Sequence, residues 1–498
     1  MAYVYLVSVF VIATCGLVYE LVAGALASYL LGDSVTQFST VIGVYLFSMG
    51  IGSFFSKYIE RNIIGVFIQV EILVGLVGGF SSSILFLSFE HVASFRIILY
   101  TLVAITGMLV GLEIPLVMRF LRSHFEFKDL VARVFTFDYV GALLASLLFP
   151  LLLVPYLGLI RTSLLFGILN VLTGLLTLYL FKNEVPWIRL LKIASIVALI
   201  ALLLGFVYSE KILSFAESSN YQDKVIYSKT SRYQRIVLTH SQNDIRLFLN
   251  GNLQFSSRDE YRYHEALVHI GLAAIPNPKN VLILGGGDGL GLREVLKYPS
   301  IEKIYLVDLD KEVTELFSKH PILVSLNQNS LSSPKLKVFN EDAFLWMKET
   351  KEKFDFIIVD FPDPSNFSVG KLYTDSFYKL LNLSLNPKGL AVIQSTSPYV
   401  AKRTFSCLNT TLKSVGFSTY PYHVFVPAFG DWGYILVSKE QFHLSKNYPK
   451  ELKFINFDIA ESLFVFPSDM SLSSEPVNKL NNQILVRLFE EEWGAFIH

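Results

Sequence analysis

The sequence predicts two unlike parts: a multi-span α-helical membrane domain at the N-terminus, and a C-terminal α/β domain preceded by a small antiparallel β unit. The first observation is the distribution of charge. Residues 1–210 hold only 22 of the 84 Asp, Glu, Lys and Arg residues, and the remaining 288 positions hold 62. The second is a series of long apolar stretches before residue 210. The third is the alternation of strand-like and helix-like segments after about residue 280, which is typical of an open α/β sheet.

Composition excludes several classes of protein. The chain has 498 residues, of which 52% are hydrophobic, so it is too long and too apolar to be a disordered segment. Its 42 basic and 42 acidic residues give a formal net charge of zero, whereas a general nucleic-acid binder needs a basic surplus. The two cysteines, Cys15 and Cys407, lie too far apart in sequence for a disulfide scaffold or a cysteine-based zinc site. Neither a nucleic acid nor a metal is therefore expected as a partner.

Seven apolar stretches in the first part are long enough to cross a bilayer, which takes about 20 helical residues. They lie at about 3–31, 39–56, 65–88, 97–118, 137–157, 160–181 and 190–208. The fifth and sixth are separated only by a break around Leu159–Arg161. The first is not a cleaved signal peptide, because it lacks a basic start and a small-residue cleavage site. We predict that residues 1–210 form a membrane domain with about seven transmembrane helices and that the lipid bilayer is a partner.

The loops between these stretches give conflicting signals about orientation. Nine Lys and Arg residues follow the second, fourth and sixth stretches, whereas the intervening loops offer only Arg96 and Arg161. The positive-inside rule then places the N-terminus inside, and seven spans leave the C-terminal domain outside. Either the count differs by one, for instance through a re-entrant segment, or the rule fails here.

Acidic residues also occur inside the apolar stretches, namely Glu20, Glu71, Glu113 and Asp138. A carboxylate within a membrane is a candidate functional group, because burying it is costly unless it is paired or hydrated. Interhelical hydrogen bonding to neighbours such as Tyr19 or Gln69 is the alternative interpretation. That alternative is favoured, since no pattern of charge marks a substrate path.

The remaining chain divides into three segments, at 211–260, 261–440 and 441–498. The first is predicted to be the small β domain, because three stretches in it alternate apolar and polar residues between turn-prone sequences. Those stretches lie at 224–231, 232–240 and 245–254. The second segment is the α/β domain, which a helix at 260–274 introduces. The third has the features of a terminal extension only.

Within the α/β domain, short apolar strands alternate with helices such as 292–297 and 375–386. The predicted strands are 280–284, 303–307, 335–339, 354–359 and 389–394. Acidic residues follow the second, third and fourth strands, at Asp308, Asp342 and Asp360. Open α/β sheets bind their ligands at the carboxyl ends of the strands, so these acids are candidate ligand contacts.

The first strand runs directly into the glycine-rich turn 285–291. Such a turn alone is weak support for a ligand site, and dinucleotide binding is a competing interpretation. Asp288, however, stands in the middle of the turn, where its charge would repel a pyrophosphate held on backbone N–H groups. Asp308 is well placed to bind ribose hydroxyls. A nucleoside without phosphates but with a nearby positive charge fits both acids, as in S-adenosylmethionine or a close relative.

A second acidic cluster follows the fourth strand. Asp360 and Asp363 are three positions apart at a strand end, so both can face one cleft. With Asp288 and the acids of segment 259–265, they form a site rich in carboxylates without the histidine grouping of a metal centre. This arrangement suits a polycationic substrate. A single acid pair would favour the alternative, a solvated acidic loop or a set of helix caps. Four coordinated placements of acids do not favour it.

Five motifs in this region resemble those of the spermidine synthases, or polyamine aminopropyltransferases, in the family's order and spacing. They are LNGNLQFSSRDEYRYHE, GGGDGLGLREVLKYP, the acid pair after the second strand, EDA, and DFPDP followed by KLYTDSFY. The resemblance covers about residues 222–440, and the multi-span N-terminus is similar to the membrane-attached bacterial branch. It implies a Rossmann-like, methyltransferase-type fold. It also implies aminopropyl transfer from decarboxylated S-adenosylmethionine to putrescine, which gives spermidine and methylthioadenosine.

The resemblance implies roles for individual residues, with Asp360 as the catalytic proton acceptor. The residues expected to bind the donor and methylthioadenosine are Gln234, Asp308, Asp342 and Ala343. Those expected to bind the polyamine are His264, Asp288 and Asp363. Tyr263 and Gln254 are candidate walls of the site. The alternatives are core packing for Tyr263, a polar strand position for Gln254 and a structural helix histidine for His264. No cofactor is expected, because the donor is a co-substrate.

Departures from the family's pattern bear mainly on the acceptor. Asp308 stands where the family usually has Glu, Phe361-Pro362 replaces a small hydroxyl pair, and 366–368 lacks the usual Gly-Pro step. We therefore expect an intact donor site, while the identity of the diamine stays open. Two other functions are alternatives: an S-adenosylmethionine-dependent methyltransferase, which predicts no acid pair at the amine end, and a membrane polyamine sensor or transporter.

The implied donor also bears on location. Decarboxylated S-adenosylmethionine is a cytosolic metabolite, so we expect a multi-pass protein of the cell (inner) membrane with its catalytic domain in the cytoplasm. The resemblance further implies that the protein forms homo-oligomers.

Overall fold

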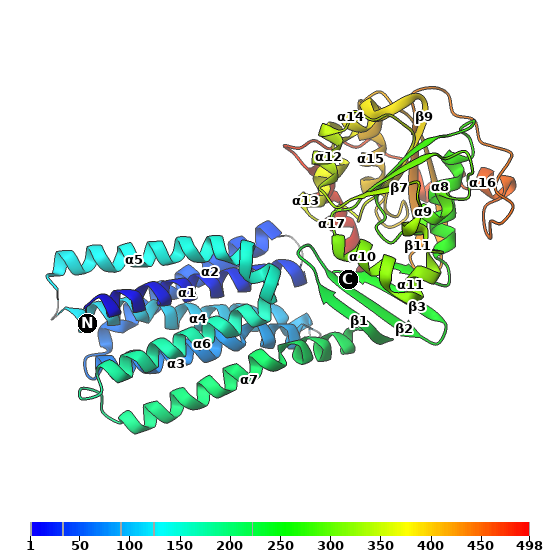
Figure 1. Ribbon diagram of the computed structural model, residues 1–498. Coiled ribbons are helices and arrows are strands. Elements are labelled where there is room, and N and C mark those ends of the chain that lie inside the picture. The colour runs from blue at the N-terminus through cyan, green and yellow to red at the C-terminus, as the bar shows by residue number, and fades with distance from the viewer. Residues whose placement is uncertain (1, 32–33, 90–91, 123–124, 222, 498) are drawn as a thin grey trace. The chain divides into compact units, whose positions relative to one another are not determined.

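Two units make up the chain, Met1–Lys224 and Val225–His498. The computed structural model describes residues 2–31, 34–89, 92–122, 125–221 and 223–497. The first unit is helical, and the second contains the two sheets (Figure 1). The helical unit extends beyond residue 210, where the charge density changes, because its last helix continues to Asn220.

The α-helices of the first unit follow the apolar stretches of the sequence. Among the described residues they are α1 (Ala2–Leu31), α2 (Ser34–Phe55), α3 (Ile63–Ser88), α4 (Val92–Leu121), α5 (Phe127–Leu148), α6 (Val154–Leu180) and α7 (Ile188–Asn220). A short 3₁₀ turn, Ser56–Tyr58, follows α2. Helices satisfy every interior backbone N–H and C=O group within one segment, which an apolar environment demands.

Six described stretches are long and apolar enough to cross a membrane, and one of them is unusually long. This stretch, Phe127–Leu180, has 54 residues and contains both α5 and α6, joined by a π-helical turn at Phe149–Leu153. A continuous helix of that length would measure about 80 Å, against a hydrocarbon core of about 30 Å. Gly158, with a φ of +73°, interrupts the helix beside the predicted break at Leu159–Arg161, so each side is of spanning length.

A hydrogen-bonded chain of buried polar side chains links three helices of this unit. Asn170 of α6 donates from Nδ2 to Oε2 of Glu71 on α3 at 2.9 Å. The hydroxyl of Tyr19 on α1 donates to Oδ1 of Asn170 at 3.0 Å. Glu71 thus takes part in the interhelical hydrogen bonding that the sequence favours, through Asn170 rather than through Tyr19 directly.

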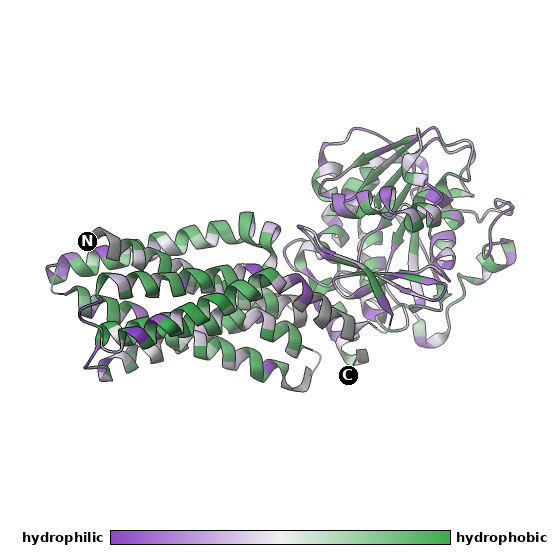
Figure 2. Cartoon of the chain, turned by 60° about the horizontal axis from the view of Figure 1, so that its bottom comes forward, coloured by the Kyte–Doolittle hydropathy of each residue, from purple (hydrophilic) through white to green (hydrophobic). Residues whose placement is uncertain are grey.

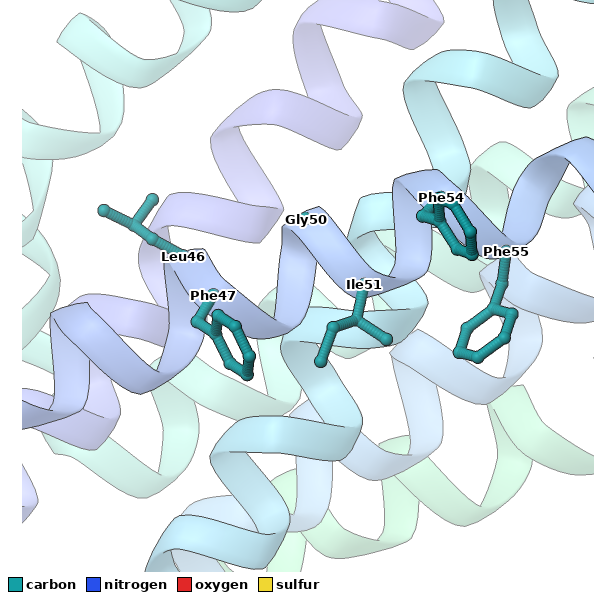
Figure 3. Close-up of a pocket in the computed structure, with 6 residues that line it drawn as sticks. All are labelled: Leu46, Phe47, Gly50, Ile51, Phe54 and Phe55. Atoms are coloured by element: carbon teal, nitrogen blue, oxygen red, sulfur yellow. The ribbon is translucent and has the colours of Figure 1, made fainter.

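Large apolar side chains are exposed over the first unit, whose helices are strongly hydrophobic along their lengths (Figure 2). On α2, an apolar pocket of about 520 Å³ is lined by Leu46, Phe47, Gly50, Ile51, Phe54 and Phe55 (Figure 3). Phe47 is 71% exposed. Contiguous apolar surface of this kind is rare on soluble proteins and marks a surface that contacts lipid or another apolar partner.

The second unit begins with a four-stranded sheet in the order β1-β2-β3-β4. The strands are β1 (Lys224–Thr230), β2 (Arg235–Ser241), β3 (Asp244–Leu249) and β4 (Asn252–Ser256). The stretch 245–254 forms two strands, because Asn250 and Gly251, in the turn-prone sequence within it, adopt left-handed φ angles of +51° and +81° and make a hairpin turn. The apolar face of this sheet packs on the α/β domain, where Phe255 contacts Phe317 with ring centroids 6.0 Å apart.

The larger sheet has seven strands in the order β10-β11-β9-β8-β5-β6-β7. They are β5 (Asn280–Gly285), β6 (Lys303–Val307), β7 (Leu336–Phe339), β8 (Phe354–Asp360), β9 (Leu385–Gln394), β10 (Ser418–Val426) and β11 (Gly430–Ser438). β5 to β9 are parallel, and β11 is antiparallel to both of its neighbours. The central strands are continuous apolar runs, as expected for a sheet covered on both faces.

Helices cover both faces of this sheet. They are α8 (Glu260–Leu272), α9 (Leu290–Val295), α10 (Lys311–Lys319), α11 (Pro321–Leu326), α12 (Ala343–Glu349), α13 (Phe367–Gly370), α14 (Asp375–Ser384), α15 (Lys402–Ser414), α16 (Phe457–Ser462) and α17 (Ile484–Ile497). Alternate residues of β5 enter different cores. Leu282 and Leu284 pack with side chains of α12, α14 and α15, and Val281 and Ile283 pack with those of α8 and α9. This is the Rossmann-like arrangement that the sequence predicts.

Candidate active site

The carboxyl ends of three parallel strands meet at one edge of the large sheet. Gly285, the last residue of β5, lies opposite Asp360, the last residue of β8. Leu284 of β5 pairs with Val307 of β6, so Asp308 follows at the same level. The strand order reverses around β5, which is where open α/β sheets place their ligands. The topology thus brings the glycine-rich turn and two of the predicted acids together.

The glycine-rich turn leaves room for Asp308 and holds its carboxylate. A Cβ on Gly287 would lie 2.6 Å from Oδ2 of Asp308, so no larger residue fits there without displacing the acid. The Gly287 N–H donates to Oδ2 at 3.0 Å, and the Asp310 N–H donates to Oδ1 at 2.9 Å. Burial raises the pKa of Asp308 to about 6, and these two backbone donors oppose the rise.

Gln234 reaches this edge from the small sheet through Asp310. Its Nε2 donates to Oδ2 of Asp310 at 3.0 Å, and the Ser231 hydroxyl donates to the same oxygen at 2.6 Å. The other oxygen of Asp310 accepts the Glu312 N–H and caps α10. Asp310 was not among the predicted site residues, although its place in the acid pair after β6 was a signal that could have singled it out.

Asp342 and Ala343 lie at the start of α12. Oδ1 of Asp342 accepts the N–H groups of Phe344 and Leu345, which makes Asp342 the N-cap of this helix. Its Oδ2 accepts from Nζ of Lys371 at 2.5 Å. Partial burial raises the pKa of Asp342, but the Lys371 ammonium and the helix N–H groups outweigh that effect and hold it below its usual value. Ala343 is buried beside it.

Asp360 is a partly buried acid with one neutral hydrogen-bond donor. The Tyr263 hydroxyl donates to Oδ1 of Asp360 at 2.5 Å, so Tyr263 does more than form a wall of the site. Burial raises the pKa of Asp360 to about 6. The charge of His264 lowers this pKa, the charge of Asp288 raises it, and the Tyr263 hydrogen bond lowers it. The carboxyl group can therefore exchange a proton near neutral pH.

His264 belongs to a buried ionic network. Its Nδ1 donates to Oε2 of Glu260 at 2.8 Å, and both oxygens of Glu260 accept from Arg293, at 2.9 and 3.0 Å. Burial alone would lower the pKa of His264, but the hydrogen bond and charge of Glu260 raise it to about 9. Asp288 and Asp360 contribute in the same direction. A cationic His264 reduces the repulsion between these two acids. Its contact with the polyamine stays a prediction.

Asp288 lies in the turn after β5, and Asp363 lies three residues after the end of β8. Oδ1 of Asp288 accepts the Leu290 N–H at 2.8 Å at the start of α9. Burial raises the pKa of Asp288, and the charge of His264 opposes the rise. Asp363 accepts from Nε2 of Gln394, the last residue of β9, at 3.1 Å. It also accepts from the hydroxyl of Thr396, two residues further along the chain, at 3.2 Å. Burial raises the pKa of Asp363 to about 6.

Gln254 makes only a local contact among the hydrogen bonds that the structure describes for it. Its Nε2 donates to the Asn252 carbonyl at 3.1 Å within β4. This matches the alternative interpretation of Gln254 as a polar residue on a strand face. No group of three or more His, Cys, Asp or Glu side chains placed to hold a metal occurs among the described residues.

The similarity to known proteins extends over the whole chain. A family model, the spermine/spermidine synthase domain, matches residues 260–448. A polyamine aminopropyltransferase of Leptospira interrogans is 52% identical over 491 residues, which cover 99% of this chain and 99% of that protein. The chain belongs to the polyamine aminopropyltransferase family. The resemblance of the five motifs to this family is therefore confirmed.

A further relative and two solved structures are also similar to this chain. Polyamine aminopropyltransferase 2 of Ralstonia nicotianae is 50% identical over 499 residues, with 98% of each chain covered. A solved spermidine synthase from Thermotoga maritima is 28% identical, with a TM-score of 0.46, and covers 55% of this chain and 88% of its own. A spermidine synthase in complex with the transition-state analogue AdoDATO is also 28% identical, with a TM-score of 0.47 and coverages of 55% and 89%.

Proposed function

We propose that the protein transfers the aminopropyl group of decarboxylated S-adenosylmethionine to a diamine, putrescine, and so makes spermidine. Membership of the family supports aminopropyl transfer. The observation that carries the assignment to this edge of the sheet is Asp360, a partly buried acid opposite Gly285 at the end of β8, whose pKa is raised to about 6. Asp288 and Asp363 supply further carboxylates, as a diamine with two ammonium groups requires.

The reaction needs positioning and one proton acceptor. Alkyl ammonium groups have pKa values near about 10, so the attacking amine must lose a proton near neutral pH. The neutral amine attacks the aminopropyl carbon, a carbon–nitrogen bond forms, and the carbon–sulfur bond breaks. Its electron pair leaves on the sulfur of methylthioadenosine, and the amine proton passes to Asp360. Tyr263 holds the Asp360 carboxylate in place during this step.

The donor is proposed to bind along the ends of β5, β6 and β7. Asp308 would accept from ribose hydroxyls, and Asp342 and the Ala343 backbone would contact the adenine. Gln234 would contact the nucleoside from the small sheet, fixed by Asp310. Asp288, in the glycine-rich turn, would balance the cationic groups of the donor. Because Asp308 is shorter than the usual Glu, the Gly287 N–H that fixes it gains importance.

Turnover provides the direct test of this function. The purified full-length protein, supplied with decarboxylated S-adenosylmethionine and putrescine, is expected to release methylthioadenosine and spermidine in equal amounts. A panel of diamines in the same assay identifies the preferred acceptor. No turnover with any diamine would contradict the proposal. Turnover with S-adenosylmethionine itself would instead favour a methyltransferase.

The pH dependence of kcat is expected to report the ionisation of Asp360. Burial raises the pKa of this acid to about 6, and only its ionised form accepts a proton. With both substrates saturating, kcat should therefore be constant above about pH 7 and fall about tenfold per unit well below pH 6. Because Asp363 titrates in the same range, the profile is compared with that of Asp363→Asn. A rate that does not change down to pH 4.5 would argue against a carboxylate as the proton acceptor.

Replacing Gly287 with alanine is expected to weaken donor binding selectively. The added Cβ would meet Oδ2 of Asp308 at 2.6 Å and displace the ribose contact. Losing a charge-assisted hydrogen bond corresponds to a rise in the donor KM of about 10- to 100-fold, with the KM for putrescine unchanged. Gly291→Ala is the matched control, since a Cβ there meets nothing within 4 Å. An unchanged donor KM in Gly287→Ala would remove Asp308 from the donor site.

The first unit is proposed to anchor the enzyme in the cell (inner) membrane, with the catalytic unit in the cytoplasm. The six long apolar stretches and the exposed apolar side chains of α2 support the anchor. The cytosolic donor supports the orientation, against the count of basic residues in the loops. A reporter that is active only in the cytoplasm, fused after His498, tests the orientation. Release of the protein from membranes by alkaline carbonate would contradict the anchor.

A further inference from the structure

The segment after residue 441 is attached to the α/β domain by specific hydrogen bonds. Glu265, a buried residue of α8, accepts from three successive backbone N–H groups of this segment. These belong to Lys453, Phe454 and Ile455 and lie 2.8, 2.8 and 2.9 Å from the carboxylate oxygens. Three donors on one buried carboxylate fix the backbone firmly. The segment is therefore part of the second unit's fold, although the family model ends at residue 448.

The last helix, α17, is fixed against α15 by an acidic side chain. Glu492 accepts from the backbone N–H groups of Arg403 and Thr404 at 2.7 and 3.0 Å, and from the Thr404 hydroxyl at 2.7 Å. These N–H groups lie in the first turn of α15 and have no partner within their own helix. Glu492 thus caps α15 and sets the rotation of α17, which fixes the position of the neighbouring Trp493.

Trp493 is connected to Asp363 through one threonine. Its Nε1 donates to Oγ1 of Thr396 at 3.3 Å, and Oγ1 lies 3.2 Å from Oδ2 of Asp363. An indole N–H only donates, so the Thr396 oxygen accepts from it and the threonine proton is free for Asp363. Thr396 is buried and has a φ of +58°, a conformation that its surroundings must maintain. The chain Trp493–Thr396–Asp363 therefore orients the carboxylate.

A second connection runs through Asn478 to the segment that follows Asp363. The side-chain Nδ2 of Asn478 donates to the backbone carbonyls of Gly370 and Tyr373 at 3.4 and 3.0 Å. The backbone carbonyl of Asn478 accepts the Asp375 N–H at 2.9 Å. Tyr373 in turn donates from its hydroxyl to the carbonyls of 361 and 362, between the two acids. Asn478 is fully buried. The C-terminal segment thus supports both ends of the loop that carries Asp363.

We infer that the C-terminal segment sets the affinity for the diamine, with Trp493 and Asn478 as positioning residues that fix Asp363 and its loop. This inference rests on the proposed function, in which Asp363 binds an ammonium group of the acceptor. The described hydrogen bond and ring contacts of Trp493 do not include Gln234, Asp308 or Asp342, on the donor side of the site. Asn478 also holds the stretch that carries Lys371, the partner of Asp342, so Trp493 is the residue whose change should alter recognition of the diamine and leave recognition of the donor intact.

The test compares Trp493→Phe with the wild type in the full-length protein. Phenylalanine keeps an aromatic ring but cannot donate to Thr396, so Asp363 loses one fixed partner. The KM for putrescine and its dissociation constant, measured by calorimetry with methylthioadenosine bound, are expected to rise about 3- to 10-fold. The donor KM should stay within twofold. Arg487→Gln, at an exposed position of the same helix where the side chain pairs with Glu491, is the control and should change neither constant.

A second variant separates positioning from a general structural effect. Thr396→Val removes the shared hydroxyl, and Thr396→Ser restores it. Thr396→Val should weaken putrescine binding as Trp493→Phe does. The double variant with both changes should bind putrescine no more weakly than the weaker-binding of the two single variants. Thr396→Ser should bind putrescine as the wild type does. Additive losses, or equal losses for donor and diamine, would overturn the inference. Calorimetry needs no turnover, so the two proposals can fail separately. If the wild type showed no activity but the variants still bound putrescine more weakly than the wild type, this inference would be supported and the proposed function contradicted.

Discussion

Replacing Asp360 with asparagine is expected to reduce kcat by about 10³-fold while leaving the fold intact. Asparagine has the same shape and can still accept a hydrogen bond from Tyr263, which lies 2.5 Å from Oδ1. It cannot take a proton from the attacking amine, so the nucleophile is no longer generated at the reacting carbon. Release of methylthioadenosine, measured at saturating donor and putrescine, reports the loss.

Two comparisons keep this prediction specific. The dissociation constant for methylthioadenosine should change less than threefold, because the proposed donor contacts lie on other strand ends. Asp458→Asn, at an exposed position in the first turn of α16, should retain full activity and controls for the change of charge. Activity of Asp360→Asn within tenfold of the wild type would show that another group accepts the proton.

Asp360 was predictable because its position depends on local sequence and simple topology. A buried parallel strand is a continuous apolar run, and β8 ends where that run meets an acid. The same reasoning placed Asp308 after β6 and the glycine-rich turn after β5. Once the strands are parallel and adjacent, their carboxyl ends meet, so no knowledge of side-chain packing was needed.

Contacts between distant segments could not be predicted in this way. Trp493 and Thr396 are far apart in the sequence, and their hydrogen bond depends on how α17 packs against α15. The antiparallel strands β10 and β11 and the C-terminal segment also lacked a clear signal. Glu260 and His264 differ, because residues four apart on a helix face each other, and this spacing could have revealed their pairing.

The contacts of His264 show what the structure adds to the predicted site. From the motif it was expected to bind the polyamine. In the structure its Nδ1 is taken by Glu260, and its pKa of about 9 keeps it positively charged at neutral pH. A fixed cation beside Asp288 and Asp360 reduces the repulsion between the two acids. The net charge of the site therefore depends on the Glu260–His264 pair as well as on the acids at the strand ends.

Replacing Arg293 with methionine is expected to lower the free energy of unfolding of the second unit by about 3–5 kcal/mol. Arg293 is buried and donates to both oxygens of Glu260 and to Oε1 of Glu294. Burial would raise the pKa of Glu260, but His264 and Arg293 together lower it to about 2. Without the guanidinium, a buried carboxylate loses two charge-assisted hydrogen bonds and keeps only its histidine partner.

Urea denaturation of the full-length protein in detergent, followed by tryptophan fluorescence, measures this loss, since Trp346, Trp432 and Trp493 all lie in the second unit. Arg403→Met is the matched control. Its side chain is half exposed and pairs with Glu475 and Glu491, so it should cost less than about 1 kcal/mol. Adding Glu260→Gln to Arg293→Met removes the buried carboxylate that has lost its guanidinium partner and should recover part of the stability. A loss for Arg293→Met no larger than for Arg403→Met would mean that water or a neighbouring group replaces the guanidinium.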